Sequence, residues 1–470
     1  MNLDRLTISG FRGLLGTELT DETVVLLVKA FIDPLLVSPL AGGESHNKKQ
    51  TNKLHILIGR DGRESGIHIE EIIVKTLVEN GINVTVGGIL TTPSVLYLTK
   101  TLTFDAGIII TASHNPIEYN GLKFVNNDGF FVSHEFIQKM KDGINLGDMV
   151  PNNESVMGEI IYDSTLAKRY TDHIISSFSK LKTKMRVIVD PVNSSGSIMS
   201  PEFLRGLGCE VIMINDEPIG IFARQAEPNP QALLELGRAT LGYAMDIGFG
   251  LDPDGDRLAL VDENGIPVFE EYTLALCAKA VYEKLKKENV LSSAGPLVIN
   301  LSSSNTSSDV AKEYGIETKR SKVGEANVVE KMIENNSMFG GEGSGGVIFR
   351  PVNFCRDSFV GMALILNLME ETGKKLSVLV DELPKYIMAK TKISQVIGDR
   401  LQVTENQKLK DLFKNGDLDD SDGLRFDFSD SSWIQIRASN TEPIVRIYGE
   451  AKTQERIDEL VNLAKKTLSY

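Results

Sequence analysis

The chain has 470 residues, of which 41% are hydrophobic and 24% charged, which is the profile of a globular protein of about three or four domains. Its formal net charge of −14 argues against general binding to nucleic acid or to an anionic membrane surface, so a bound anion must be held by a local basic cluster. The cysteines are scattered, the N-terminus is charged where a signal peptide would be apolar, and no uncharged run reaches the length of a membrane span, which predicts a cytoplasmic protein without disulfides.

Short apolar runs alternate with helix-period segments along most of the chain, which predicts an α/β fold. The predicted strands are Leu54–Ile58, Val84–Gly87, Gly107–Thr111, Arg186–Asp190, Val211–Ile214, Ile247–Leu251, Leu258–Asp262 and Leu297–Leu301. The predicted helices are Asp21–Phe31, Ser65–Glu79, Tyr272–Glu288, Gly324–Asn335, Phe359–Glu371 and Thr453–Leu468. The polar segments Ala41–Lys53 and Lys414–Gly423 predict a surface loop and a solvated acidic turn.

A short strand, a polar or glycine-rich loop and a second strand recur at Gly107–Val125, Asp246–Asp262 and Ser337–Phe349. Three diverged copies of one α/β unit, each supplying one functional loop, would explain this recurrence. After about Tyr386 the pattern changes to short alternating strands and a terminal helix, which predicts a small antiparallel sheet packed with helices. The predicted domains are residues 1–155, 156–268, 269–385 and 386–470.

Three carboxylates alternate in the segment DPDGDR, which lies between two apolar runs. Pro253 and Gly255 favour a tight loop in which these like charges converge, and such convergence is unfavourable unless a cation lies among them. All-oxygen ligands favour a hard divalent cation, and a set this small leaves room for a substrate oxygen, which suits magnesium. The alternatives are a surface acidic turn and an EF-hand, although an EF-hand needs flanking helices and a later glutamate. The predicted metal ligands are Asp252, Asp254 and Asp256.

The segment TASHNP, followed by NGLKF, places Ser113 just after a buried strand, on a loop that Pro116 helps to end. A loop end of this kind presents a hydroxyl to a cleft. The G-x-S-x-G pattern of many hydrolases is absent here, whereas a phosphoserine would bring its own transferable group. Lys123 and Arg12 are candidates for proton handling and charge stabilisation. Taken alone, such a serine more often caps a turn, so the interpretation rests on the whole set of motifs.

The segment GGEGSGG, Gly340 to Gly346, is bare of bulky side chains, and glycines let a backbone approach a ligand closely. Glu342 and Ser344 are then candidates for hydrogen bonds to sugar hydroxyls. A simple tight hairpin is an equally good interpretation of this segment taken alone.

In the segment RASNTEPIVR, two arginines bracket a turn rich in oxygen-anion donors. Backbone amides of such a turn form an anion nest, and arginine forks match phosphate geometry. The sequence therefore predicts a phosphate site, with a purely structural turn as the alternative. Its predicted residues are Arg437, Ser439, Asn440, Thr441 and Arg446.

Taken together and in this order, TASHNP with NGLKF, DPDGDR, GEGSGG and RASNTEPIVR resemble the signature loops of the α-D-phosphohexomutase family. TISGFRG near the N-terminus and GRDGRESG at Gly59–Gly66 also resemble that family's opening motifs, so the resemblance covers about Thr7 to Glu450. It implies three similar α/β domains with mixed sheets and a C-terminal α+β domain, arranged around a central cleft.

The resemblance also implies roles for individual residues. Ser113 matches the phosphoserine, whose phosphate completes a magnesium site with the three aspartates. Glu342 and Ser344 match sugar contacts, and the residues of the RASNTEPIVR segment match the site of the phosphate that is not transferred. The residues that match active-site positions around the transferred phosphate are Arg12, His114, Lys123 (a general acid/base candidate) and Arg257.

The implied reaction interconverts hexose 6-phosphate and hexose 1-phosphate through a 1,6-bisphosphate. The SNTEP form of the last motif favours mannose and glucose phosphates as substrates. Phosphoglucosamine mutase is the alternative activity, and a sugar-phosphate-binding relative without catalysis is a more distant one. The expected partners are small hexose phosphates, with a monomer or homodimer as the assembly. Several bacterial members of the family carry histidine where this chain has Gly346, which leaves one proton-transfer partner unassigned.

Overall fold

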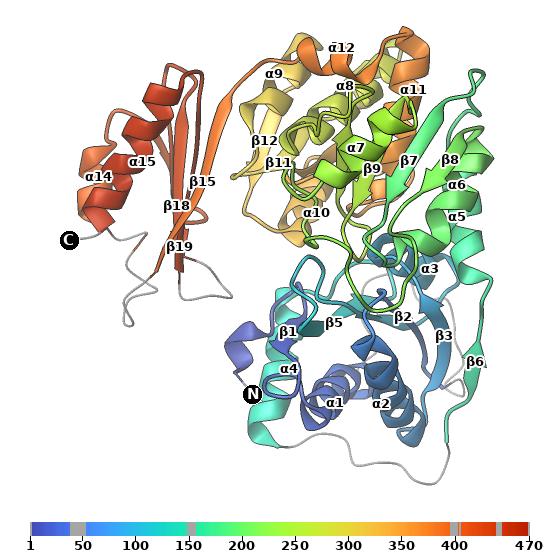
Figure 1. Cartoon of the computed structure of the whole chain (residues 1–470). Coiled ribbons are helices and arrows are strands. Elements are labelled where there is room, and N and C mark those ends of the chain that lie inside the picture. The colour runs from blue at the N-terminus through green and yellow to red at the C-terminus, as the bar shows by residue number, and fades with distance from the viewer. Residues whose placement is uncertain are drawn as a thin grey trace. The chain divides into compact units, whose positions relative to one another are not determined.

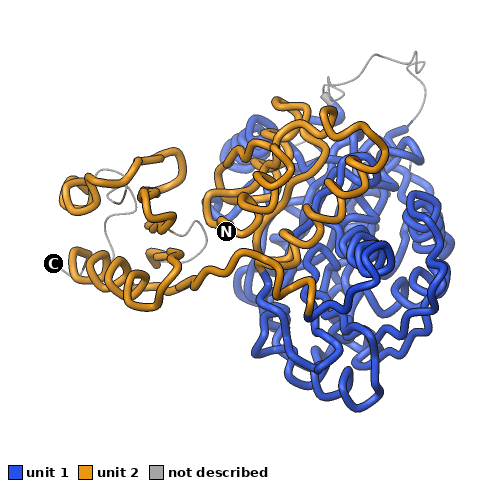
Figure 2. Tube along the Cα trace, turned by 90° about the horizontal axis from the view of Figure 1, so that it is seen from above, with its two compact units in different colours: residues 1–270, 346–377 blue, residues 271–345, 378–470 orange. Residues whose placement is uncertain are grey.

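The computed structural model describes residues 2–37, 53–147, 157–394, 403, 406–438 and 444–468. The chain divides into two compact units, unit 1 with residues 1–270 and 346–377 and unit 2 with residues 271–345 and 378–470 (Figure 2). Most of the predicted surface loop at Ala41–Lys53 lies outside the described residues. In the part of the chain that is described, no helix is both long and apolar enough to cross a membrane.

The first sheet of unit 1 has the strand order β1-β5-β4-β2-β3-β6. Its strands are β1 (Phe11–Leu14), β2 (His55–Arg60), β3 (Asn83–Ile89), β4 (Ala106–Ile110), β5 (Tyr119–Asn126) and β6 (Ile160–Tyr162). The central strand β4 reads AGIII and is buried throughout, because neighbouring strands and helices on both faces enclose it. The helices of this part are α1 (Asp21–Val37), α2 (Ser65–Glu79) and α4 (His134–Leu146) on one face and α3 (Thr92–Thr101) on the other (Figure 1).

The second sheet of unit 1 has the order β10-β9-β7-β8. Its strands are β7 (Arg186–Asp190), β8 (Glu210–Met213), β9 (Ile247–Leu251) and β10 (Leu258–Val261). The accompanying helices are α5 (Leu166–Ser177), α6 (Gly196–Leu207), α7 (Leu234–Gly242) and α11 (Ser358–Thr372), and the chain reaches α11 from strand β14 (Gly346–Phe349). Strand β9 is buried throughout and is parallel to β7 but antiparallel to β10.

In unit 2, β11 (Leu297–Asn300) lies between β12 (Thr318–Ser321) and β13 (Phe339–Glu342) and is parallel to both. The helices of this part are α8 (Glu271–Lys287), α9 (Asn305–Glu313) and α10 (Glu325–Glu334), with α12 (Leu376–Asp381) at the unit boundary. The C-terminal sheet is antiparallel, in the order β15-β19-β18-β17-β16. Its elements are β15 (Ile387–Ser394), β16 (Asp417–Asp419), β17 (Leu424–Asp427), β18 (Trp433–Ala438), β19 (Ile444–Ala451), α14 (Gln407–Leu412) and α15 (Gln454–Leu468).

The predicted repeat is visible in the strand order. In the first sheet, β4 precedes the functional loop and pairs with β2, which in turn pairs with β3. The second sheet has the same order in β9, β7 and β8, with β9 before its functional loop. The third sheet has it again in β13, β11 and β12, with β13 before its loop. The first two functional loops each connect antiparallel neighbours, β4 to β5 and β9 to β10. One α/β pattern therefore positions each loop at the carboxyl end of a central strand.

The predicted strands and helices are confirmed, with ends that differ by a few residues. Helix α1 is longer than predicted, because it continues past Pro34 to Val37. A proline near the end of a helix removes one hydrogen bond, and the burial of Leu35 in the core contributes stability to the last turn. The prediction of a solvated turn at Lys414–Gly423 is wrong for its central residues, because Asp417–Asp419 forms β16 and pairs with β17.

Candidate active site

Two predicted loops meet within unit 1. Ser113 follows β4, and the segment from Asp252 to Arg257 follows β9, so both loops leave the carboxyl ends of buried strands. The Oγ atom of Ser113 lies 3.3 Å from Oδ2 of Asp252. The structure therefore brings the predicted carrier serine to the edge of the predicted metal loop.

The three aspartates of the metal loop converge. Their side chains are fully buried, and one oxygen from each lies within 4.8 Å of the others. One oxygen of each carboxylate accepts hydrogen bonds of 3.1 Å or shorter from the protein. The donors are the amides of Asp256 and Arg257 to Asp252 Oδ1 (3.0 and 3.1 Å), Thr92 Oγ1 and Lys123 Nζ to Asp254 Oδ2 (both 2.6 Å), and Arg356 Nη2 to Asp256 Oδ2 (2.5 Å).

The second oxygen of each carboxylate is what fits a cation. Among the described residues, Asp254 Oδ1 and Asp256 Oδ1 are buried without a hydrogen-bond partner, and the Oδ2 atom of Asp252 accepts a long hydrogen bond of 3.3 Å from Ser113 Oγ. Burial and the charges of Asp256 and Asp254 raise the pKa of Asp252 well above its usual range. Buried polar atoms rarely lack partners, and three oxygen ligands in one place suit a hard divalent ion. The residues present therefore fit a divalent cation.

Lys123, another predicted site residue, lies on β5 and is almost completely buried. Its ammonium donates to Asp254 Oδ2 and lies 3.7 Å from Asp256 Oδ2. Burial alone would raise the pKa of Asp254, but the charge of Lys123 and the hydrogen bonds from Lys123 and Thr92 act in the opposite direction, and the pKa is lowered. Lys123 thus keeps one carboxylate of the group ionised.

Ser113 has a backbone φ of 50°, a left-handed conformation that is uncommon for residues other than glycine and often marks functional sites. Its Oγ atom also lies 3.3 Å from Nδ1 of His114. Burial, followed by the charges of Arg257 and Arg12, lowers the pKa of His114 well below its usual value. A group whose pKa is lowered in this way is neutral at pH 7, so the serine hydroxyl lies between a carboxylate and a neutral imidazole.

The two other predicted arginines of unit 1 belong to the same charged cluster. Arg12 donates from Nη1 to Asn115 Oδ1 at 3.0 Å, and the charges of Asp254 and Asp256 act on its guanidinium. Arg257 donates to Glu227 at 2.7 Å, with its Nε atom 4.0 Å from Asp256 Oδ1. Positive charge therefore surrounds the serine and the carboxylates.

Sequence reasoning did not assign a role to Arg63, which is completely buried beside the serine loop. Its guanidinium donates to Asp61 Oδ2 at 3.1 Å and to four backbone carbonyls. These carbonyls belong to Ser113 (2.8 Å), Asn115 (2.7 Å), Pro116 (2.7 Å) and Tyr119 (2.7 Å). Arg63 and Asp61 both lie in the GRDGRESG motif, and this motif is the sequence signal that could have identified them. Arg63 therefore fixes the conformation of the loop that carries Ser113.

The predicted sugar-binding loop lies in unit 2 and follows β13. Glu342 is buried, and its Oε1 atom accepts hydrogen bonds from Asn300 Nδ2 at 2.7 Å and from the amide of Gly324 at 2.9 Å. Ser344 is partly exposed in the turn that follows. The glycines serve packing here, because a Cβ atom at Gly343 would lie 1.6 Å from the carboxylate of Glu271.

The two arginines of the predicted phosphate site meet on the C-terminal sheet. Arg437 of β18 and Arg446 of β19 are directly opposed in the antiparallel register. Directly opposed like charges are unfavourable, and an anion between them relieves the repulsion. Asp422 accepts a hydrogen bond from Arg437 at 2.8 Å. The predicted residues Ser439, Asn440 and Thr441 lie outside the described residues.

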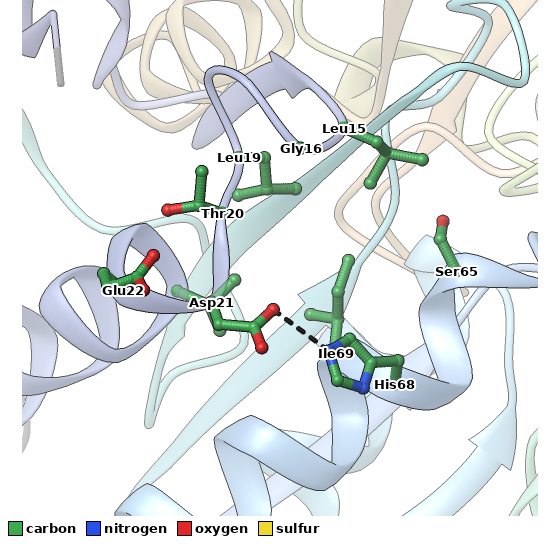
Figure 3. A pocket seen from close by; sticks show the side chains of 10 residues that line it. Leu15, Gly16, Leu19, Thr20, Asp21, Glu22, Ser65, His68 and Ile69 are labelled. Atoms are coloured by element: carbon green, nitrogen blue, oxygen red, sulfur yellow. Dashed lines mark hydrogen bonds and ion pairs between the residues drawn. The ribbon is translucent and has the colours of Figure 1, made fainter.

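A pocket of about 510 Å³ opens at the start of α1 and α2 (Figure 3). His68 Nε2 and Asp21 Oδ1 lie 3.0 Å apart at its edge, and both side chains are exposed. None of the predicted site residues lines this pocket, so it is separate from the cluster around Ser113.

Models of the four domains of phosphoglucomutase/phosphomannomutase match the chain. The α/β/α domains I, II and III match residues 6–149, 168–265 and 270–386, and the C-terminal domain matches residues 397–465. A phosphoglucomutase/phosphomannomutase of Thermococcus kodakarensis is 34% identical, covering 98% of this chain and 97% of that protein. A phosphoglucosamine mutase of Methanococcus vannielii is 33% identical, covering 92% and 94%.

Solved structures share the fold. A phosphoglucomutase/phosphomannomutase family protein of Burkholderia thailandensis superposes with a TM-score of 0.84 at 22% identity, covering 100% of this chain and 97% of that one. An N-acetylphosphoglucosamine mutase of Aspergillus fumigatus, in complex with GlcNAc-6P and magnesium, gives 0.60 at 12% identity, covering 98% and 96%.

The fold is that of a phosphohexomutase, with three α/β domains and a C-terminal α+β domain as predicted. The chain belongs to the phosphoglucomutase/phosphomannomutase family. It is accordingly an isomerase that moves a phosphoryl group between two positions of a hexose phosphate.

Proposed function

We propose that Ser113 carries the phosphoryl group and that glucose and mannose phosphates are the substrates. The observation that carries the first part is the contact of Ser113 Oγ with Asp252, beside three buried carboxylates that each offer one oxygen. A serine in a strained backbone conformation next to a cation site fits a phosphoryl carrier better than a turn cap.

Asp252, Asp254 and Asp256 would hold Mg²⁺, the metal present in the Aspergillus complex. A bound Mg²⁺ would neutralise negative charge on the phosphoryl group. The cations of the protein act in the same direction, because Lys123, Arg12 and Arg257 surround the same carboxylates. This supply of positive charge suits phosphoryl transfer, which depends on positioning and electrostatic stabilisation.

The proposed reaction has two transfers. In the first, the free hydroxyl of a hexose monophosphate attacks the phosphorus, its new P–O bond forms, the bond to Ser113 Oγ breaks, and the hydroxyl proton passes to a base. In the second, the resulting 1,6-bisphosphate has turned end for end and returns its other phosphoryl group to Ser113. Lys123 is the general acid/base candidate, and His114 is a neutral neighbour of the serine oxygen.

In unit 2, Glu342 and Ser344 would bind the sugar hydroxyls. Arg437 and Arg446, with the turn at residues 439–441, would bind the phosphate that is not transferred. Because both ends of the bisphosphate carry phosphate, one such site serves both orientations. The family matches support a division of the chain near residues 155, 268 and 385, with one functional loop in each domain.

The substrate is tested by coupled turnover assays with Mg²⁺, a trace of hexose 1,6-bisphosphate, and glucose, mannose and glucosamine 1-phosphates side by side. We expect turnover of the glucose and mannose compounds at least about tenfold faster, in kcat/KM, than of the glucosamine compound. A preference for glucosamine phosphate would reassign the chain to the activity named for its Methanococcus relative. Binding of sugar phosphate with no turnover would favour the non-catalytic alternative.

Arg446→Ala is expected to raise KM for both sugar monophosphates by about 10- to 100-fold, with kcat changed by less than about threefold. The reason is that a charge-assisted hydrogen bond to the non-transferred phosphate is lost, whereas the cluster around Ser113 is intact. Steady-state kinetics measure both constants. Arg456→Ala is the matched control, because Arg456 lies on α15 and pairs with Asp430 and Glu459. An unchanged KM in Arg446→Ala would remove this arginine from the phosphate site.

A further inference from the structure

One arginine of the metal loop's surroundings was not predicted. Arg356 is 7% exposed and donates from Nη2 to Asp256 Oδ2 at 2.5 Å. Its charge also acts on Arg12, His114 and Arg257, so it belongs to the cluster around Ser113. No sequence motif drew attention to it, because it lies in the segment between β14 and α11.

The path of the Arg356 side chain depends on Gly346, the first residue of β14. A Cβ atom at Gly346 would lie 3.1 Å from Cγ of Arg356, which is a tight contact, and 2.4 Å from Cδ, which is closer than real Cβ atoms come to their neighbours. The φ of Gly346 is outside the left-handed range, so its backbone alone would accept another residue. A larger residue at this position would therefore have to displace the Arg356 side chain.

Hydrogen bonds hold the backbone around Arg356 against β14 and against the metal loop. The amide of Asp357 donates to the carbonyl of Val347 at 2.9 Å, and the Asp357 carboxylate caps the first amides of α11. The Oγ atom of Ser358 donates to the carbonyl of Gly255 at 2.7 Å, inside the metal loop. The backbone at Arg356 is therefore held rigidly close to Asp256, which limits the conformational entropy lost when the Arg356 side chain is ordered.

We infer that Arg356 is a positioning residue for Asp256, and that Gly346 is glycine because Arg356 occupies the space over it. Arg356 holds Oδ2 of Asp256, which directs Oδ1 toward the oxygens left open on Asp252 and Asp254. Residues that hold a metal ligand in place change metal affinity or activity by about 10- to 100-fold when they are replaced. This inference rests on the proposed function for its catalytic consequence but not for its geometry.

The test is a double-mutant cycle with Gly346→Ala, Arg356→Ala and the double variant. Each single change is expected to lower kcat by at least about tenfold with KM for sugar phosphate nearly unchanged, and to weaken Mn²⁺ binding, measured by electron paramagnetic resonance, by a similar factor. In the Arg356→Ala background, Gly346→Ala is expected to change either quantity by less than about twofold, because the obstructing side chain is gone. Arg356→Lys retains the charge and is expected to recover part of the loss.

Two controls separate this coupling from general damage. Gly242→Ala adds a methyl group where no atom lies within 4 Å, so it should leave both quantities unchanged. Arg224→Ala removes another arginine of unit 1, whose side chain is 6% exposed and pairs with Asp190 at 2.9 Å, so its effect on the unfolding midpoint should add to that of Gly346→Ala.

Additive effects of the two single changes, or Mn²⁺ binding unaltered in Gly346→Ala, would overturn the inference. The outcome is also distinguishable from failure of the proposed function. If the wild-type chain shows no mutase turnover but the effects of the two changes on Mn²⁺ binding are non-additive, the inference stands and the proposed function fails. If turnover is normal but the effects of the two changes are additive, the proposed function stands and the inference fails. Should Arg356→Ala fail to fold, Arg356→Lys and Gly346→Ala still supply the comparison.

Discussion

Replacing Ser113 with alanine is expected to reduce kcat by about 10⁴-fold or more, because the atom that accepts the phosphoryl group is removed. The binding of hexose monophosphate should change by less than about threefold, since the proposed sugar and phosphate contacts lie on other loops. The measurements are steady-state turnover with Mg²⁺ and a titration of sugar phosphate against the variant.

The fold should survive this change, because the Ser113 hydroxyl has only two contacts of 3.3 Å among the described residues. Ser176→Ala, on the exposed side of α5, is the matched control and should retain full activity. Turnover of Ser113→Ala within tenfold of the wild-type rate would exclude a covalent carrier at this residue.

Arg63→Met is expected to lower the free energy of unfolding by about 3–5 kcal/mol. The change leaves the buried Asp61 carboxylate without its cation and removes the arginine's hydrogen bonds to four carbonyls of the serine loop. Because this loop holds Ser113 in its left-handed conformation, activity should fall together with stability. Urea unfolding followed by circular dichroism measures the first effect.

Arg169→Met is the control for the loss of an arginine, since this side chain is half exposed and lies 3.6 Å from Asp163. An exposed pair of this kind contributes about 0–1 kcal/mol. A free energy of unfolding in Arg63→Met within about 1 kcal/mol of the wild-type value would mean that the serine loop is fixed by other contacts.

Much of the fold and of the site could be predicted because local sequence determines them. Buried strands such as β7 (RVIVD) and β9 (IGFGL) are built around short apolar runs, and the predicted bounds of both agree with the structure. The serine and aspartate loops each follow such a strand directly. Because β4 and β9 belong to different sheets, however, only the family resemblance implied that the two loops meet.

The remainder depends on contacts between distant segments, which no single-sequence pattern encodes. Arg63 contacts carbonyls some fifty residues away, and Arg356 reaches a carboxylate exactly one hundred positions earlier in the chain. A buried arginine looks like a surface residue when only its neighbours in sequence are considered. The strand β16 was missed for a related reason, because its acidic residues are stabilised by pairing with β17 rather than by intrinsic propensity.

The most direct test of the account is to incubate the purified chain with radiolabelled glucose 1,6-bisphosphate and Mg²⁺ and to map the label by peptide mass spectrometry. We expect label on Ser113, followed by its transfer to unlabelled hexose monophosphate at a rate consistent with turnover. Label on another residue, or label on Ser113 that sugar phosphate does not remove, would contradict the account.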